Sequence, residues 1–595
     1  MTDLATTDLG PLPTWNLDDL YPGTDSVGLT ADLEKSEREA VAFRQRHAGQ
    51  LAQRGAAGLA EAIVAFEAID QTLGRLLSYA NLVYASDMSD PKVGRFYQTL
   101  QERVNAISAN LVFFTLEINQ LDEDTLKGWV AKNKILTRYA PWLRDTRIFK
   151  PHVLGDEMER LLHERSVVGR AAWNRLFDET MAALRFPLGG SQLTSTQALD
   201  RLSDRDPAVR REAGEVVGKV LGDNIRTFAL ITNTLVKDKE IDDKWRNYPR
   251  PPSFRNLSNR VEDEVVDALV AAVKAAYPQL SHRYYALKAK WFGGDRLDYW
   301  NRNAPLPDVP DRVHSWTEAR DIVLGAYRRF SPELATIGGR FFELPWIDAP
   351  LRPGKAPGAF AHPTVPAVHP YLLVNYQGRT RDVMTLAHEL GHGVHQVLAA
   401  DQGHLLSDTP LTLAETASVF GEMLTFRALL EAETEPKRRR AMLASKVEDM
   451  LNTVVRQIAF YDFELRVHTE RRSGELTADR LGEIWLAVQA ESLGPALRFD
   501  DGYRHYWSYI PHFVHSPFYV YAYAFGDCLV NSLYAAYTET PEGFAGKYIE
   551  MLKAGGTKPH QDLLAPFKLD ASDPAFWQKG IAVVSGFIDA LEAEG

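Results

Sequence analysis

Cysteine is almost absent from this sequence: among its 595 residues there is one, Cys528. No disulfide can therefore form within the chain, and a chain of this length without disulfides is typical of a reducing, cytoplasmic environment. Cys528 lies in an aromatic and apolar stretch, so we expect a packed, inert thiol rather than a nucleophile.

Long apolar runs and a basic excess are also missing. The best membrane candidate, residues 517–526, is ended by Asp527 and is far shorter than the roughly 20 apolar residues that a transmembrane helix needs. The N-terminus lacks the basic segment and apolar run of a signal peptide. A formal net charge of −12 argues against nucleic acid or an anionic membrane as the main partner.

Helical periodicity covers most of the sequence. Residues 30–75 alternate charged and apolar positions, which predicts amphipathic helices. Asp90-Pro91 and Asp206-Pro207 each combine a good N-cap with a residue tolerated at the first helical position. We expect them to begin helices that reach about residues 121 and 236. Because the chain is too long for one compact core, two or more lobes are expected.

Strand signals are few. Residues 184–194 contain Gly189-Gly190 between short apolar runs and predict a hairpin, and residues 371–376 predict a single strand. Seven prolines between residues 345 and 370 exclude a regular helix there. We therefore predict a mainly α fold with a small β-sheet.

The most informative motif is His388-Glu389-Leu390-Gly391-His392, in a predicted helix from Thr385 to about Ala400. Two histidines four residues apart lie on one helix face and can bind the same Zn²⁺. Glu389 can take a proton from metal-bound water and deliver it to a leaving amine. The alternative is an ordinary helix with solvated or packed histidines. Gly391 and Gly393, poor helix formers within one turn, indicate close approach of another backbone or helix.

A catalytic zinc needs a third protein ligand and an open position. The next predicted helix, residues 411–430, carries Glu415, which a loop and a returning helix can bring to the metal. Glu422 lies two turns further on the same face and can accept the second N–H of a ligand histidine. Either glutamate can instead belong to a solvated helix face. His395 is a rival ligand, but three ligands from one helix would strain the tetrahedron, so a packing role is favoured.

The zinc motif and the segment Leu413-Ala414-Glu415-Thr416-Ala417-Ser418 together resemble peptidase family M3, in particular its oligoendopeptidase F branch, relatives of thimet oligopeptidase. Residues 15–21, 354–360 and 510–523 are also similar to that branch, so the likeness spans nearly the whole chain. Asn301 departs from it, because relatives commonly carry an Asp near this position.

This resemblance implies that His388, His392 and Glu415 are the ligands of one Zn²⁺ per chain and that Glu389 is the general base. The same ligand set also suits cobalt or manganese. Glu422 is still expected to accept the second N–H of a ligand histidine.

By the same resemblance, His512 and the tyrosines of residues 519–523 face the substrate. A Tyr hydroxyl or imidazole N–H beside the zinc can donate to the oxyanion that forms on the attacked carbonyl. Tyr519 and Tyr523 are four apart and share a helix face, so they are the favoured catalytic tyrosines. Tyr521 points elsewhere and is kept as a substrate-binding candidate. An aromatic core stripe is the alternative for each of them.

The family implies a mainly α, two-lobed helical metallopeptidase with a deep central channel and a small β-sheet beside the zinc helix. We expect an N-terminal helical region at residues 1–200 and a catalytic domain at 201–595. Within the catalytic domain, zinc helices are expected at 385–430 and substrate-binding helices at 510–595.

Such a channel would admit short, flexible peptides. The strand at residues 371–376 can pair with an extended peptide, and Gly358, followed by Ala359, can let that backbone approach closely. The sequence therefore predicts a zinc-dependent endopeptidase that hydrolyses internal bonds of short oligopeptides. A zinc carboxypeptidase of related helical fold and a catalytically silent peptide-binding homologue are the alternatives.

Overall fold

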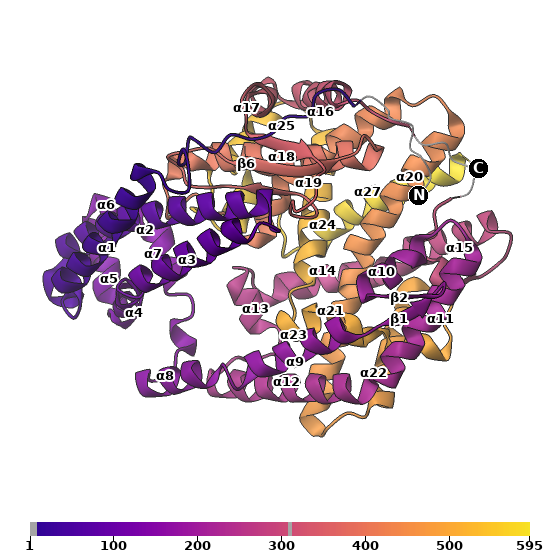
Figure 1. Cartoon of the computed structure of the whole chain (residues 1–595), viewed down its shortest axis with the longest axis horizontal. Helices are drawn as coiled ribbons and strands as arrows, with labels where there is room; N and C mark the ends of the chain where they lie inside the picture. The colour runs from indigo at the N-terminus through magenta and orange to yellow at the C-terminus, as the bar shows by residue number, and fades with distance from the viewer. Residues whose placement is uncertain (1–8, 307–311, 595) are drawn as a thin grey trace. The chain divides into compact units, whose positions relative to one another are not determined.

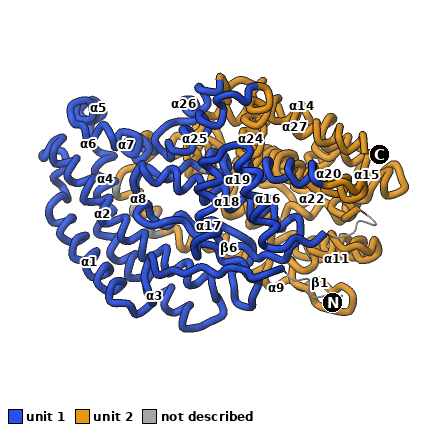
Figure 2. Tube along the Cα trace, turned by 90° about the horizontal axis from the view of Figure 1, so that it is seen from above, with its two compact units in different colours: residues 1–150, 311–432, 540–567 blue, residues 151–310, 433–539, 568–595 orange. Residues whose placement is uncertain are grey.

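The computed structural model describes residues 9–306 and 312–594, most of which are helical (Figure 1). The chain divides into two compact units (Figure 2). Unit 1 comprises Met1–Lys150, Asp311–Ala432 and Thr540–Phe567, and unit 2 comprises Pro151–Pro310, Glu433–Glu539 and Lys568–Gly595.

The mainly helical fold in two lobes is thus confirmed, whereas the expected channel stays a prediction. The proposed boundary at residue 200 does not coincide with the division into units, because each unit is assembled from three separate stretches of the chain. Among the described residues, no helix is both long and apolar enough to cross a membrane.

Most helices of unit 1 come from two stretches of the chain, residues 1–150 and 311–432, and the second stretch also contains three strands. Its elements are α1 (Val27–His47), α2 (Leu51–Ser86), α3 (Pro91–Ser108), α4 (Val112–Gln120), α5 (Glu123–Lys132), α6 (Lys134–Arg138), α7 (Ala140–Thr146), α16 (Trp316–Phe330), α17 (Pro332–Glu343), β4 (Ile347–Pro350), β5 (Phe360–His362), β6 (Tyr371–Tyr376), α18 (Thr380–Ala399), α19 (Leu411–Ala432), α25 (Phe544–Lys553) and α26 (His560–Leu564).

Unit 2 is also helical, with two small two-stranded sheets. Its elements are α8 (Asp156–Arg165), α9 (Arg170–Ala183), β1 (Phe186–Leu188), β2 (Ser191–Leu193), α10 (Ser195–Asp200), α11 (Pro207–Asp223), α12 (Ile225–Trp245), α13 (Ser253–Ser258), α14 (Asp263–Ala276), α15 (Ser281–Trp291), β3 (Leu297–Asp298), the 3₁₀ helix η4 (Tyr299–Asn301), α20 (Pro436–Thr453), α21 (Val455–Glu470), α22 (Ala478–Leu493), β7 (Leu497–Arg498), the 3₁₀ helix η7 (Asp501–Tyr509), α23 (His512–His515), α24 (Tyr521–Glu539) and α27 (Pro574–Ala593).

Both Asp-Pro pairs begin helices as predicted. The Asp90 carboxylate accepts a hydrogen bond from the Lys92 amide at 2.7 Å, and the Asp206 carboxylate accepts one from the Ala208 amide at 2.8 Å. The two helices are shorter than expected, since α3 ends at Ser108 and α11 at Asp223, and a second helix follows each. The predicted hairpin forms as β1 and β2, and Cys528 is fully buried, as expected.

The three-stranded sheet of unit 1 has the order β4-β6-β5 and packs against α18, so the small sheet expected beside the helix of the HExxH motif is confirmed. Because β6 is the central strand, both its edges are occupied, and the expected pairing of this strand with a peptide is wrong. The far edge of β4 is also engaged, since the Ala349 amide donates to the Pro13 carbonyl at 2.9 Å. The other edge of the sheet belongs to β5, which pairs with no further strand among the described residues, although its Ala361 carbonyl accepts a hydrogen bond of 3.4 Å from Gln396 on α18.

The unusual Asn301 has a structural partner in unit 2. Its side-chain oxygen accepts a hydrogen bond of 2.9 Å from Nε of Arg210, a buried arginine on α11. Arg210 also donates to the carbonyls of Asp204 and Arg205. The neutral Asn301 amide thus accepts the hydrogen bond of the Arg210 guanidinium, whereas an Asp at this position would form an ion pair with it. Residue 301 therefore has a structural role.

Candidate metal centre

The metal centre is built where α18 crosses α19 in unit 1. A Cβ atom on Gly391 would lie 2.4 Å from the Ala417 carbonyl oxygen and 2.6 Å from Cα of Ser418. One on Gly393 would lie 2.8 Å from the ring of Phe341. The close approach predicted from the two glycines is therefore confirmed, against a backbone for Gly391 and against an aromatic ring for Gly393.

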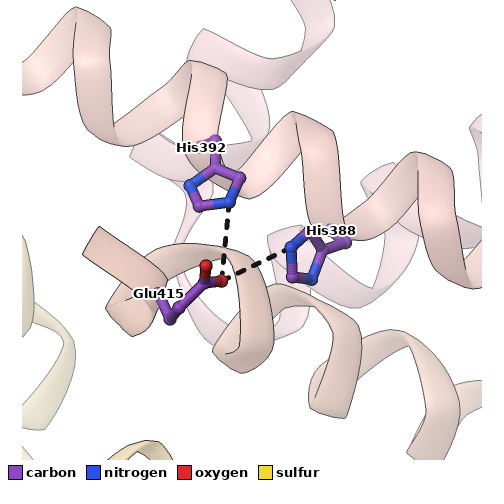
Figure 3. Close-up of side chains that lie close together, drawn as sticks. All are labelled: His388, His392 and Glu415. Carbon is purple, nitrogen blue, oxygen red and sulfur yellow. Dashed lines mark ion pairs between the residues drawn. The ribbon is translucent and has the colours of Figure 1, made fainter. Parts of the chain in front are cut away.

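The crossing brings His388, His392 and Glu415 together (Figure 3). Oε2 of Glu415 lies 3.4 Å from Nε2 of His388 and 3.5 Å from Nε2 of His392. Ligand atoms bound about 2.0–2.2 Å from a tetrahedral zinc lie about 3.3–3.6 Å from one another. The donor set and its spacing thus fit a zinc ion with three protein ligands, and no other such cluster of His, Cys, Asp and Glu occurs among the described residues.

Glu422 lies behind His388 on α19. Its Oε2 is 3.3 Å from Nδ1 of His388, so an N–H at Nδ1 can donate to the carboxylate and leave Nε2 with a lone pair for a metal. Burial alone would lower the pKa of His388, but the hydrogen bond to Glu422 and the charge of Glu415 outweigh it and the pKa is raised. By contrast, burial lowers the pKa of His392 to about 4, which keeps this imidazole neutral as a ligand must be.

Glu389 is only 7% exposed and lies against the edge strand β5. The Ala361 amide on β5 hydrogen-bonds its carboxyl group. Burial is the main reason that the pKa of Glu389 is raised to about 7, with a smaller contribution from the charge of Glu415. A carboxyl group with a pKa near neutrality can both accept and return a proton, which is what general acid–base chemistry requires.

His395 is not part of the cluster. It is 6% exposed, and its Nε2 lies 3.4 Å from the Thr409 hydroxyl. Burial lowers its pKa to about 4, so it packs as a neutral imidazole beside the centre. This is the packing role favoured from the sequence.

His512, Tyr519 and Tyr523 form a separate cluster in unit 2. The Nε2 atom of His512 lies 3.3 Å from the Tyr523 hydroxyl, and the ring of Tyr519 stacks on His512 at 6.0 Å between centroids. Tyr519 precedes α24 rather than lying within it, but its ring still contacts that of Tyr523. Tyr523 is 37% exposed.

Tyr521 has no exposed surface, and its hydroxyl accepts a hydrogen bond of 2.9 Å from Asn259. The prediction that Tyr521 binds substrate is therefore wrong for this structure, because the start of α24 turns the ring into the core of unit 2. The expectation that it points away from Tyr519 and Tyr523 is confirmed.

Two side chains, the buried Glu464 and the partly exposed Arg255, hold the segment that carries this cluster. Glu464 accepts a hydrogen bond of 2.9 Å from the amide of Phe518, whose φ of 58° needs such support. Arg255 donates to the Pro517 carbonyl and lies over the ring of Tyr519. These supports were not predictable from the sequence, since they lie 54 and 262 residues away from the segment along the chain.

Gly358 and Ala359 lie immediately before β5. Gly358 has a φ of +78°, and its carbonyl accepts a hydrogen bond of 2.9 Å from Asn375 on β6. No atom lies within 4 Å of the position that a Cβ would take. The edge strand β5 itself was not predicted from the sequence, because three residues among prolines carry no detectable periodicity.

Comparisons with known proteins agree with this centre. The family model described as peptidase family M3 matches residues 333–583, and the one described as oligopeptidase F matches residues 117–186. The two matches together cover more than half of the chain. The chain belongs to peptidase family M3. The prediction of a metalloendopeptidase, a hydrolase of peptide bonds from the oligoendopeptidase F branch, is thereby confirmed.

Relatives of this family resemble the chain over nearly its full length. Oligopeptidase PepF of Bacillus subtilis is 27% identical over 97% of this chain and 87% of the relative. A crystal structure from Chlamydophila abortus has a TM-score of 0.88 at 20% identity and covers 98% of both chains. Oligoendopeptidase F from Enterococcus faecium has a TM-score of 0.70 at 23% identity, covering 96% of this chain and 97% of that one. These structures share the helical fold.

Proposed function

We propose that this M3 peptidase is a zinc-dependent endopeptidase that hydrolyses internal bonds of short oligopeptides. The observation that carries the proposal is the tetrahedral spacing of His388, His392 and Glu415, with Glu389 on the same helix. When bound, zinc polarises the peptide carbonyl and makes its water acidic. The names of the relatives, oligopeptidase and oligoendopeptidase, support peptides as the substrate class.

Glu389 is proposed to move the proton in both halves of the reaction. It accepts the proton of the attacking water and returns it to the leaving amine, which its near-neutral pKa allows. The Ala361 amide fixes the orientation of the carboxyl group on the side of β5.

The peptide backbone is proposed to lie along β5. This strand is the edge of the sheet that pairs with no further strand among the described residues, and Gly358 and Ala359 lead into it. An extended peptide added to such an edge gains affinity through backbone hydrogen bonds and so shows little side-chain preference.

His512 and Tyr523 are proposed to stabilise the oxyanion of the tetrahedral intermediate. The pairing of their polar atoms and the exposure of Tyr523 support this role, with Tyr519 as the second tyrosine. Tyr523→Phe should lower kcat by about 10²-fold with little change in KM, because only the transition state loses a hydrogen bond. Tyr521→Phe is the matched control and should leave kcat unchanged, since its hydroxyl serves the core. Equal losses in both variants would argue against the assignment.

A peptide-library digest tests the function itself. Mass spectrometry of peptides up to about 20 residues should show fragments cut at internal bonds, and a chelator should abolish them. Ladders that lose only C-terminal residues would favour the carboxypeptidase alternative. Bound zinc without any cleavage would favour a silent peptide-binding protein.

Glu422 offers a test of the centre that does not depend on activity. Glu422→Ala should lower the affinity for zinc by about 10- to 100-fold, because His388 loses the acceptor that orients it. Competition with a chromogenic chelator measures this affinity. Glu431→Ala, on the same helix and 70% exposed, is the control and should bind zinc like the wild type. If Glu422→Ala bound zinc as tightly as the wild type, Glu422 would not be needed to orient His388.

A further inference from the structure

Two buried tyrosines of unit 1 bond the backbones of the helices that carry the metal ligands. Tyr327 lies on α16 and is 2% exposed, and Tyr548 lies on α25 and is 1% exposed. The helix α16 packs against both α18 and α19, and α25 packs against α18 (Figure 1). Neither tyrosine has a part in the reaction proposed above, so their hydroxyl groups need another explanation.

Tyr327 reaches the backbone beside the first histidine ligand. Its hydroxyl donates a hydrogen bond of 2.7 Å to the carbonyl of Ala387, the residue immediately before His388. The same hydroxyl lies against α19, since a Cβ atom on Gly421 would collide with it. Gly421 immediately precedes Glu422, whose Oε2 is 3.3 Å from Nδ1 of His388. Tyr327 therefore contacts both helices, at the residues next to His388 and Glu422.

Tyr548 makes the equivalent bond on α19. Its hydroxyl donates to the Thr416 carbonyl at 2.8 Å, and Thr416 immediately follows the ligand Glu415. Its ring is held by Phe420 on α19, at 4.6 Å between centroids, and by Phe330 on α16, edge-on at 5.4 Å. One tyrosine thus bonds the residue before a ligand on α18, and the other bonds the residue after a ligand on α19.

A bound molecule does not account for these hydroxyl groups. Both tyrosines line a void of about 10 Å³ together with Gly391 and Ala417, where α18 crosses α19. A single water needs about 10–15 Å³ and two or more polar partners, whereas most side chains that line this void are apolar. Both hydroxyl groups already donate to carbonyls, so their partners lie within the protein.

The position of each bonded carbonyl fixes the helix to which it belongs. A helix carbonyl accepts one hydrogen bond from the amide four residues later and keeps a second lone pair, so each tyrosine bond is added without replacing a helix bond. A metal site tolerates errors of only about 0.2 Å in its ligand distances. A slide of α18 past α19 would change the 3.4 Å between Nε2 of His388 and Oε2 of Glu415. Bonds made one residue away from each ligand oppose that slide.

We propose that Tyr327 and Tyr548 are positioning residues, which bond the α18 and α19 backbones beside the ligands and so hold His388 and Glu415 at metal-binding distance. The proposal rests on the zinc-dependent function proposed above. Tyr327 acts on the helix of the histidines and Tyr548 on the helix of Glu415, and neither touches metal or substrate. Loss of either hydroxyl should therefore weaken zinc binding by the folded protein, beyond any loss of stability.

Tyr327→Phe and Tyr548→Phe each remove one hydroxyl group and keep the ring, so both variants should fold. In competition with a chromogenic chelator, each should bind zinc about 3- to 10-fold more weakly than the wild type, less than the roughly 10- to 100-fold expected for a direct partner of a ligand. Tyr376→Phe is the matched control. Its buried hydroxyl donates at 2.9 Å to the carbonyl of His314, which is in the same unit but on neither of the two ligand-bearing helices. This variant should bind zinc like the wild type.

The absorption spectrum of the cobalt-loaded protein is a readout that a purely structural role would not change. Its visible bands depend on the geometry of the ligands, so they should shift in Tyr327→Phe and Tyr548→Phe and stay in place in Tyr376→Phe. Thermal unfolding of the metal-free proteins measures stability separately. All three variants lose one buried hydrogen bond, so their unfolding temperatures should fall by similar amounts.

Wild-type zinc affinity and wild-type cobalt bands in both Tyr327→Phe and Tyr548→Phe would overturn the proposal. So would an equal loss of affinity in all three variants, because the effect would then follow stability rather than position. The endopeptidase function can fail separately. If the wild type cleaves no peptide but the two variants bind zinc more weakly, the positioning role stands and the function falls. If internal bonds are cleaved and the affinities do not differ, the positioning role falls alone.

Discussion

Glu389→Gln is expected to lower kcat by about 10²- to 10⁴-fold while zinc stays bound. The glutamine has nearly the same shape and keeps the contact with the Ala361 amide possible, but it cannot accept the proton of the attacking water. His388, His392 and Glu415 are untouched, so the metal content should be that of the wild type. The digest of a peptide library and metal analysis by mass spectrometry measure the two quantities on one sample.

Glu431→Gln removes a charge at an exposed position of α19 in the same unit and is the matched control. It should retain wild-type kcat. If Glu389→Gln cleaved peptides at nearly the wild-type rate, another group would have to accept the proton. If it lost zinc as well, the fall in kcat could not be assigned to proton transfer.

The parts of the centre that follow from local periodicity were predictable. A spacing of four residues places His388 and His392 on one face, and a spacing of seven places Glu415 and Glu422 on another. Two glycines within a single turn correctly indicated close approach to α18, by a second backbone at Gly391 and by the Phe341 ring at Gly393. The Asp-Pro pairs fixed helix starts for the same reason, since capping depends on residues next to one another.

The parts that depend on distant residues were not predictable. The strand β5 is too short to show a period, and its place at the sheet edge follows only from pairing with β6. Tyr521 could not be assigned to the core until the start of α24 was known. A sequence shows which residues share a face, and the tertiary structure decides what that face meets.

Gly391→Ala is expected to destabilise unit 1 by about 1–3 kcal/mol and to weaken zinc binding at least about tenfold. The added methyl group would lie 2.4 Å from the Ala417 carbonyl oxygen, which is a backbone atom and cannot rotate away. The helix α19 must therefore shift, and Glu415 lies on it two residues before Ala417. Because the two histidines stay on α18, the displacement separates the third ligand from the other two.

Gly325→Ala is the matched control, since it makes the same substitution within α16 of the same unit, where no atom lies within 4 Å of the new Cβ. It should stabilise the protein by about 0.5–1 kcal/mol through helix propensity and bind zinc normally. Thermal unfolding of the metal-free proteins and chelator competition separate the two effects. Gly391→Ala with wild-type zinc affinity would mean that the contact between α18 and α19 does not set the position of Glu415. A parallel loss of stability and affinity, absent from Gly325→Ala, would identify the glycine crossing as the element that holds the third ligand in place.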